Sequence, residues 1–165
     1  MNAMTKAHTV RAMQRTLATA ALGMGAVLLG LAAPAATAHA ALKTTTVGGT
    51  TVTVTTLDSH NWSRLSPTNA DTTELKDGSR GEIWTFDVDP GQCLEITMRS
   101  DDFAPYLSLR KGAPFGEELA NSDGAGRDWA KISGTAGSAG PYFVTATSSG
   151  GGEVAGKYTL DIAGC

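Results

Sequence analysis

Apolar and polar side chains alternate along most of the chain after residue 50, which predicts short β-strands rather than helices. In "EIWTFDV" (82–88) and "CLEITMR" (93–99), every second side chain is apolar. The same alternation, or a run of β-branched residues, predicts further strands at 50–57, 106–110, 117–122, 129–133, 141–147 and 157–163. These segments predict an all-β, jelly-roll-like sandwich of about eight short antiparallel strands.

The segments between these strands are polar or rich in glycine. "DPGQ" (89–92) predicts a tight turn, because it contains Pro-Gly. The polar stretch 59–81 is expected to be one long loop. The glycine-rich stretch 148–156 has the length of a hairpin connection between the last two strands.

The two cysteines, Cys93 and Cys165, lie at the ends of two predicted strands. Strand parity places Cys93 outward, because Leu94 and Ile96 face the core. Cys165 also faces outward, since Ile162 faces inward. If the two strands are antiparallel neighbours, their ends meet on one face. The parity therefore predicts a Cys93–Cys165 disulfide, worth about 4 kcal/mol in the chain-entropy model.

The N-terminus has the pattern of an export signal. A basic segment (Lys6, Arg11, Arg15) precedes an apolar stretch at 17–33, which is too short for a comfortable membrane span. Small residues follow, and we expect cleavage after Ala40, with Ala38 as the alternative. The predicted organisation is a signal peptide (1–40), a short lead (41–49) and the sandwich (50–165), with a secreted or periplasmic product of the general secretory route.

The charge balance narrows the classes of partner. The full chain carries a formal net charge of −3, and loss of the basic signal segment makes the product more acidic. An acidic protein is a poor match for nucleic acid or an anionic membrane surface. We therefore expect a monomer without a membrane span and without a nucleic-acid partner.

The order of motifs resembles the bacterial pre-peptidase C-terminal domain family over about residues 50–163. An aromatic strand is followed by a glycine turn, by "SDDFAPYL" (100–107), by "NSDG" (121–124) and by two strands containing tyrosine. The matching positions are Trp84, Phe86, Gly91, Leu94, Ile96, Ser100, Asp102, Phe103, Pro105, Tyr106, Leu107, Asn121, Asp123, Gly124, Tyr142, Gly156, Tyr158 and Leu160. The resemblance implies a non-catalytic accessory module of secreted proteins, usually beside a peptidase or another hydrolase, whereas for this chain we expect only the module after the signal.

Some relatives in that family bind calcium, which makes Asp101, Asp102, Asn121 and Asp123 the candidate ligands, with Asp128 nearby. Calcium requires six to eight oxygen ligands. Two positions that are acidic in the family pattern are Ala104 and Ser122 here. The favoured interpretation is that these side chains cap turns, and calcium remains the alternative. No other cofactor is expected.

Three aromatic residues are not clearly assigned to the core: Trp62, Tyr106 and Trp129. If exposed together, they would form a surface that binds sugars or a partner protein. The alternative, which we favour, is that the two tryptophans cover the open ends of the sandwich.

No catalytic residue is expected. His60 lies in the predicted loop without a nucleophile motif, and Glu117 and Glu118 are better explained as solvated charge than as a glycosidase pair. The sequence thus predicts a secreted binding module for an unidentified extracellular polymer or protein. A small secreted hydrolase or hydrolase inhibitor is the alternative.

Overall fold

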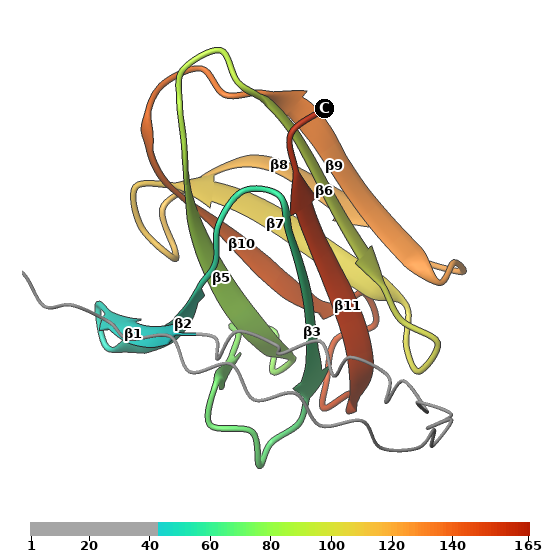
Figure 1. The fold of residues 1–165 in the computed structure, drawn as a ribbon. Coiled ribbons are helices and arrows are strands. Elements are labelled where there is room, and N and C mark those ends of the chain that lie inside the picture. Colours follow the sequence, from blue (N-terminus) through green and yellow to red (C-terminus); the bar gives the residue numbers. More distant parts are fainter. Residues whose placement is uncertain (1–42) are drawn as a thin grey trace, which may run out of the picture. The chain divides into compact units, whose positions relative to one another are not determined.

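The computed structural model describes residues 43–165, and these form eleven strands in two sheets (Figure 1). The bounds are β1 (Lys43–Val47), β2 (Thr50–Val54), β3 (Ser59–Leu65), β4 (Thr72–Glu74), β5 (Arg80–Val88), β6 (Cys93–Arg99), β7 (Pro105–Lys111), β8 (Glu117–Asp123), β9 (Trp129–Thr135), β10 (Gly140–Ser148) and β11 (Gly156–Ala163). The predicted all-β sandwich is confirmed for this part of the chain. The predicted signal peptide and its cleavage site lie outside the described residues.

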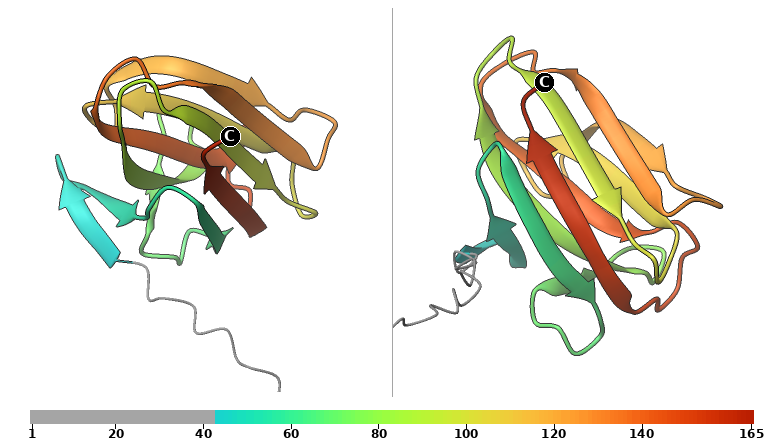
Figure 2. Two further views of the ribbon diagram at one scale, coloured as in Figure 1. Left: turned by 45° about the horizontal axis from the view of Figure 1, so that its top comes forward. Right: turned by 45° about the vertical axis from the view of Figure 1, so that its right-hand side comes forward.

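One sheet has seven strands in the order β1-β2-β5-β10-β7-β8, with β4 also paired to β5, and the other has four in the order β3-β11-β6-β9. The two views of Figure 2 show these sheets as two facing layers. The pairings within them are antiparallel except that β2 runs parallel to β5. Within residues 43–165, no helix is long and apolar enough to cross a membrane.

The core lies between the sheets and follows the alternation in the sequence. Trp84 and Phe86 on β5 face Ile96 on β6 and Leu160 on β11, and all four are almost fully buried. A smaller cluster of Val52, Ile83 and Phe143 lies on the opposite face of the seven-stranded sheet, with Val47 of β1 packed against it. The segment expected to be a short lead (41–49) thus contributes β1 to the fold.

Several predictions from the sequence are wrong in detail. The stretch 59–81 is not one loop but contains β3 and β4. The segment of β3 resembles a loop in the sequence because most of its residues are polar. Only one side of the strand is buried, and the buried residues on that side are Asn61 and Leu65. The connection 148–156 does not close a hairpin, since β10 and β11 belong to different sheets.

The predicted turn and disulfide are both present. Gly91 has a φ of 79°, and the Gln92 N–H donates to the Asp89 carbonyl at 3.2 Å, as expected for a Pro-Gly turn. Cys93 and Cys165 form a disulfide with their Cα atoms 5.4 Å apart. The strands that carry them, β6 and β11, are antiparallel neighbours. The disulfide therefore fixes the C-terminus to the start of β6 (Figure 1).

Candidate functional site

A row of four side chains crosses the outer face of the four-stranded sheet. Thr159 on β11 is paired in register with Trp62 on β3 and with Arg99 on β6. Arg99 is paired in turn with Trp129 on β9. Strand spacings of about 4.8 Å place the two tryptophan backbones about 14 Å apart. We call these four residues the tryptophan row.

The row faces outward because strand parity places its neighbours in the core. Met98 and Leu160, adjacent to Arg99 and Thr159, are fully buried. Trp62 is 55% exposed. Trp129 is partly buried, and the Arg127 guanidinium lies over its ring at 5.0 Å from the centroid, in cation–π geometry. Two aromatic side chains therefore flank the polar centre of the row.

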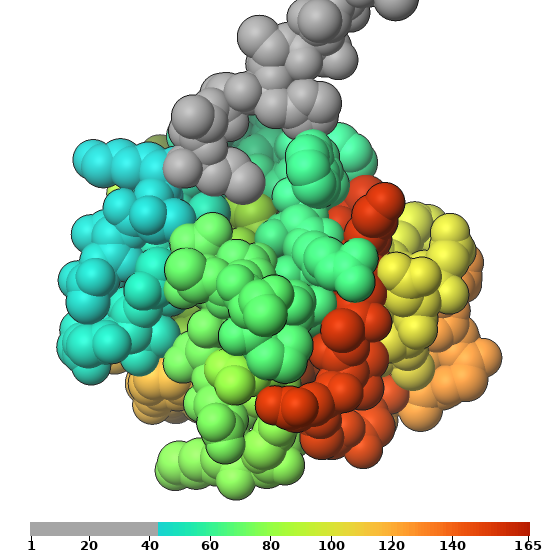
Figure 3. All heavy atoms as spheres, turned by 90° about the horizontal axis from the view of Figure 1, so that it is seen from below, coloured from blue at the N-terminus to red at the C-terminus, as the bar shows by residue number. Residues whose placement is uncertain are grey.

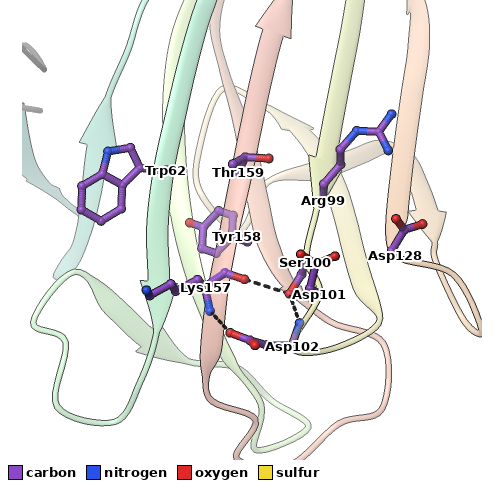
Figure 4. Close-up of a pocket in the computed structure, with 9 residues that line it drawn as sticks. All are labelled: Trp62, Arg99, Ser100, Asp101, Asp102, Asp128, Lys157, Tyr158 and Thr159. Carbon is purple, nitrogen blue, oxygen red and sulfur yellow. Dashed lines mark hydrogen bonds between the residues drawn. The ribbon is translucent and has the colours of Figure 1, made fainter. Parts of the chain in front are cut away.

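A pocket of about 540 Å³ lies along the row between Trp62 and Asp128. Figure 4 shows Trp62 at one end, Arg99 and Asp128 at the other, and Thr159 between them. A shallower depression of about 600 Å³ includes Trp129 and shares four of its lining residues with the first: Ser100, Asp101, Asp102 and Asp128. The two depressions adjoin along the β6–β7 turn, so both tryptophans border one continuous hollow surface.

The β6–β7 turn that forms this border is capped by Ser100. Its hydroxyl accepts hydrogen bonds from the backbone N–H groups of Asp102 (3.1 Å) and Phe103 (3.2 Å) and donates to the Lys157 carbonyl at 2.8 Å (Figure 4). The expectation that Asp101 and Asp102 cap this turn is therefore wrong. Ser100 is buried, and a hydroxyl can donate and accept at once.

Asp102 instead connects the turn to the strand beside it. Its Oδ2 accepts a hydrogen bond of 2.7 Å from the Lys157 N–H at the start of β11. Figure 3 shows this end of the molecule, where the red segment leading into β11 lies between the green segment before β5 and the yellow β6–β7 turn. Gly156 allows the close approach, because a Cβ built there would lie 2.4 Å from the Asp102 Cβ.

The candidate calcium ligands are divided between two surfaces. Asp101 and Asp102 line the depressions on the four-stranded sheet, whereas Asp123 lines a groove on the seven-stranded sheet. The Asp123 Oδ1 accepts the Ala125 N–H at 2.8 Å, and the Asn121 amide donates to Glu118 at 2.8 Å. In residues 43–165, no group of three or more His, Cys, Asp or Glu side chains is placed to hold a metal ion. Calcium binding stays the untested alternative.

Tyr106 lies apart from the two tryptophans. It is on β7, in register with Thr147 of β10 and Asp123 of β8, on the outer face of the seven-stranded sheet. The structure therefore combines Trp62 and Trp129 on one sheet and places Tyr106 on the other. Both tryptophans lie on strands of the four-stranded sheet and point to its outer face, whereas the favoured expectation was that they cover the open ends of the sandwich.

The residues considered for catalysis occupy exposed strand positions. His60 lies in β3, not in a loop, and its Nδ1 contacts Asp161 Oδ1 on the neighbouring strand. Glu118 accepts hydrogen bonds from Ser108 and Arg110 at 2.6 and 2.8 Å. The hydrogen bonds from Ser108 and Asn121 lower the pKa of Glu118, so this carboxylate is held ionised.

A buried polar network, missed in the sequence, lies behind the pocket. Glu82 is 1% exposed, and its carboxyl group accepts hydrogen bonds from the Tyr158 hydroxyl (2.6 Å) and the Thr53 hydroxyl (3.2 Å). The Trp84 Nε1–H donates to the same tyrosine oxygen at 2.9 Å. Burial raises the pKa of Glu82, and burial together with the Glu82 charge raises the pKa of Tyr158. The network links β5 of one sheet to β11 of the other.

A signal for this network was present in the sequence. Glu82 precedes Trp84, Phe86 and Val88 at intervals of two, which places it on the core face of its strand. An acid at a core position requires hydrogen-bonding partners. The sequence could have identified Glu82, but not Tyr158, which lies 76 residues away.

The same β-sandwich architecture is found in a solved structure. The pre-peptidase C-terminal domain of a collagenase from Bacillus anthracis superposes with a TM-score of 0.50 at 14% identity, over 66% of this chain and 91% of that domain. This chain therefore shares the fold of that domain. No family model matches the sequence, and no curated protein matches it.

Two further solved structures superpose with lower TM-scores. PliG, a periplasmic inhibitor of g-type lysozyme from Aeromonas hydrophila, has a TM-score of 0.38 at 14% identity, over 66% of this chain and 96% of its own. CsCBM6-3 from Clostridium stercorarium, solved with cellobiose, has a TM-score of 0.35 at 17% identity, over 70% and 95%. TM-scores at this level do not establish a shared fold.

Proposed function

We propose that this protein is an exported, non-catalytic binding module that holds an extended extracellular polymer on the outer face of its four-stranded sheet. The observation that carries the proposal is the tryptophan row, in which Trp62 and Trp129 flank Arg99 and Thr159 across all four strands. Indole rings supply large apolar contact areas with little loss of side-chain entropy. An extended chain can contact both rings at once.

The charges along the row suit a polar polymer. Arg99 and Lys157 supply donors, and Asp101 and Asp128 supply acceptors, around the same hollow surface. Because positive and negative side chains lie close together on this surface, it suits a partner with hydroxyl and amide groups better than a partner with a strong charge of one sign. A polysaccharide or an extended structural protein presents such groups repeatedly.

Two features support a binding role rather than catalysis. The carboxylates of Asp102 and Glu118 are already occupied by hydrogen bonds within the fold. His60 and Asp161 contact each other on an open strand face. A general base requires access to a bound substrate in a site that excludes water. The likeness in fold to the collagenase domain supports an accessory role beside a secreted hydrolase.

Export to an oxidising compartment is part of the proposal. A disulfide between Cys93 and Cys165 is typical of secreted or periplasmic proteins. N-terminal sequencing of the protein recovered from the producing cell tests this. A mature terminus at Ala41 supports the proposal, and a retained Met1 contradicts it.

The binding test is a sedimentation assay with insoluble cellulose, chitin, peptidoglycan and fibrillar collagen. For the polymer that depletes the protein from solution, Trp62→Ala and Trp129→Ala should each reduce affinity about tenfold, equivalent to about 1.4 kcal/mol. Leu119→Ala is the matched control, because Leu119 is also a large exposed apolar residue but lies outside the row. Unchanged affinity in both tryptophan variants would overturn the proposal.

The alternative functions are outcomes of parallel assays. Turnover of peptide or glycan libraries by the purified protein would indicate a hydrolase. Inhibition of a secreted hydrolase, without polymer binding, would indicate an inhibitor. Titration of calcium into chelator-treated protein tests whether calcium binds. We expect neither heat nor a shift in melting temperature, because Asp102 and Asp123 already bind backbone N–H groups on separate surfaces.

A further inference from the structure

A second groove lies on the outer face of the seven-stranded sheet, away from the tryptophan row. It has a volume of about 470 Å³, within the range of about 300–1,000 Å³ of typical small-molecule sites. Its floor is formed by β7 and β10, which lie side by side in the rear layer of Figure 1. Leu75 borders it from the segment before β5, and Phe115 from the β7–β8 connection. We call it the polar groove.

The floor of the polar groove carries hydroxyl groups. Ser108 of β7 and Thr145 and Thr147 of β10 line it. These three residues lie on the outward side of their strands, since Leu107, next to Ser108, belongs to the core between the sheets. The Thr147 hydroxyl donates to the Arg80 carbonyl at 2.7 Å, which fixes its position. The Ser108 hydroxyl likewise donates to Glu118. Because a hydroxyl has a single hydrogen, these two groups can only accept hydrogen bonds from a ligand.

Two carboxylates on the walls are held in fixed orientations. Glu118 is bound by Ser108 and Arg110, as described above. Asp77 accepts hydrogen bonds from the Ser79 hydroxyl at 2.6 Å and the Ser79 N–H at 3.0 Å. These bonds lower the pKa of Asp77 as well as that of Glu118. Both groups thus present ionised acceptors whose positions are set before any ligand arrives.

Aromatic rings complete the groove. Phe115 is 58% exposed at one wall, and Tyr106 lies partly exposed on the floor. Burial is the main cause that raises the pKa of Tyr106, and the charges of Glu118 and Asp123 add to it. The lining carries the carboxylates of Asp77, Glu118 and Asp123 and the cations of Lys76 and Arg110, so it holds one more negative than positive side chain.

We propose that the polar groove binds a neutral oligosaccharide. The fixed carboxylates and the hydroxyl-lined floor match a ligand with many hydroxyl groups, and Phe115 and Tyr106 match the apolar faces of sugar rings. Because the carboxylates of Asp77, Glu118 and Asp123 outnumber the cations of Lys76 and Arg110 in the lining, uronic acids and sulfated sugars should bind more weakly. This site is independent of the tryptophan row, and together the two surfaces would allow one molecule to contact two ligands.

The test is isothermal titration with neutral gluco-, manno- and N-acetylglucosamine oligosaccharides, and with oligogalacturonates of equal length. A neutral series should bind with a dissociation constant below 1 mM, and the oligogalacturonates at least tenfold more weakly. Phe115→Ala should weaken the binding of the neutral series about tenfold.

Leu119→Ala is the control, and it should leave sugar binding unchanged. The proposal is overturned if no neutral series binds below 1 mM, if the acidic series binds equally well, or if Phe115→Ala leaves affinity intact. Loss of sugar binding in Trp62→Ala would move the sugar to the tryptophan row. That outcome would contradict sugar binding in the polar groove and would leave the proposed function in place.

Discussion

The Tyr158 hydroxyl donates a hydrogen bond of 2.6 Å to the Glu82 carboxyl group in the interior between the two sheets. The two residues belong to different sheets, and the same tyrosine oxygen accepts the Trp84 Nε1–H. Because the network is buried, its protonation state should affect the free energy of unfolding. Tyr158 also lines the pocket beside the tryptophan row, so the network supports the floor of the proposed site.

Glu82→Gln should remove a pH dependence of stability. Burial raises the pKa of Glu82 above its ordinary value of 4.5, so the folded protein retains this proton at pH values where the unfolded chain has lost it. The free energy of unfolding should therefore fall as pH rises from about 4.5 through the raised pKa. Urea titrations between pH 4 and 8 should show this decline in the wild type but not in Glu82→Gln.

The control for this measurement is Glu95→Gln, because Glu95 forms an ion pair with Lys131 on the partly exposed sheet surface. That variant should keep the wild-type pH profile. The charge of Asp71 also raises the pKa of Glu82, so Asp71→Asn should shift the decline to lower pH. An identical profile in the wild type and Glu82→Gln would show that Glu82 is not the titrating group.

Tyr158→Phe should destabilise the fold more than a comparable change elsewhere. It removes the donor to Glu82 and the acceptor from Trp84, at about 1–3 kcal/mol for each buried group left unsatisfied. Tyr142→Phe is the matched control, since that hydroxyl donates only to the carbonyl of the exposed Ser138. Its cost should stay within about 1 kcal/mol. Equal losses in chemical denaturation would argue against a special role for the network.

Reduction of the Cys93–Cys165 disulfide should lower stability by about 4 kcal/mol in the chain-entropy model. The bond joins residues 72 positions apart, so the unfolded chain regains many conformations when the bond is broken. Denaturation with and without a reducing agent measures the difference, and Cys165→Ser should reproduce it without any reductant. Two free thiols in the mass of the untreated protein would contradict the pairing.

Gly156→Ala should destabilise the β6–β7 turn. The added Cβ would lie 2.4 Å from the Asp102 Cβ and 2.9 Å from the Phe103 ring, so the turn must move, at about 1–3 kcal/mol. Gly134→Ala is the control, because a Cβ there meets nothing within 4 Å, and its effect should stay within about 0.5 kcal/mol. Polymer binding should weaken in Gly156→Ala alone, since this turn borders the tryptophan row. Equal melting temperatures for the two variants would contradict the close packing.

The strands with one clearly apolar face could be predicted from the sequence. In β5, β6 and β11 the period of two identifies both the strand and its buried side, and this was enough to pair Cys93 with Cys165. β3 could not be predicted in this way, because its burial depends on β11, far along the chain. β4 has only three residues, which is too short for an alternation to show. The connection 148–156 was misassigned because its length is compatible with a hairpin and with a crossing between sheets.

The sequence by itself determined which side of most strands is buried, because the alternation of side chains is a local property of extended backbone. Only the tertiary structure decided which outward residues become neighbours, because strand order and register join residues far apart in the chain. Trp62 and Trp129 meet Thr159 and Arg99 through three such pairings. Tyr106, equally aromatic, lies on β7 of the other sheet, where it faces the polar groove instead.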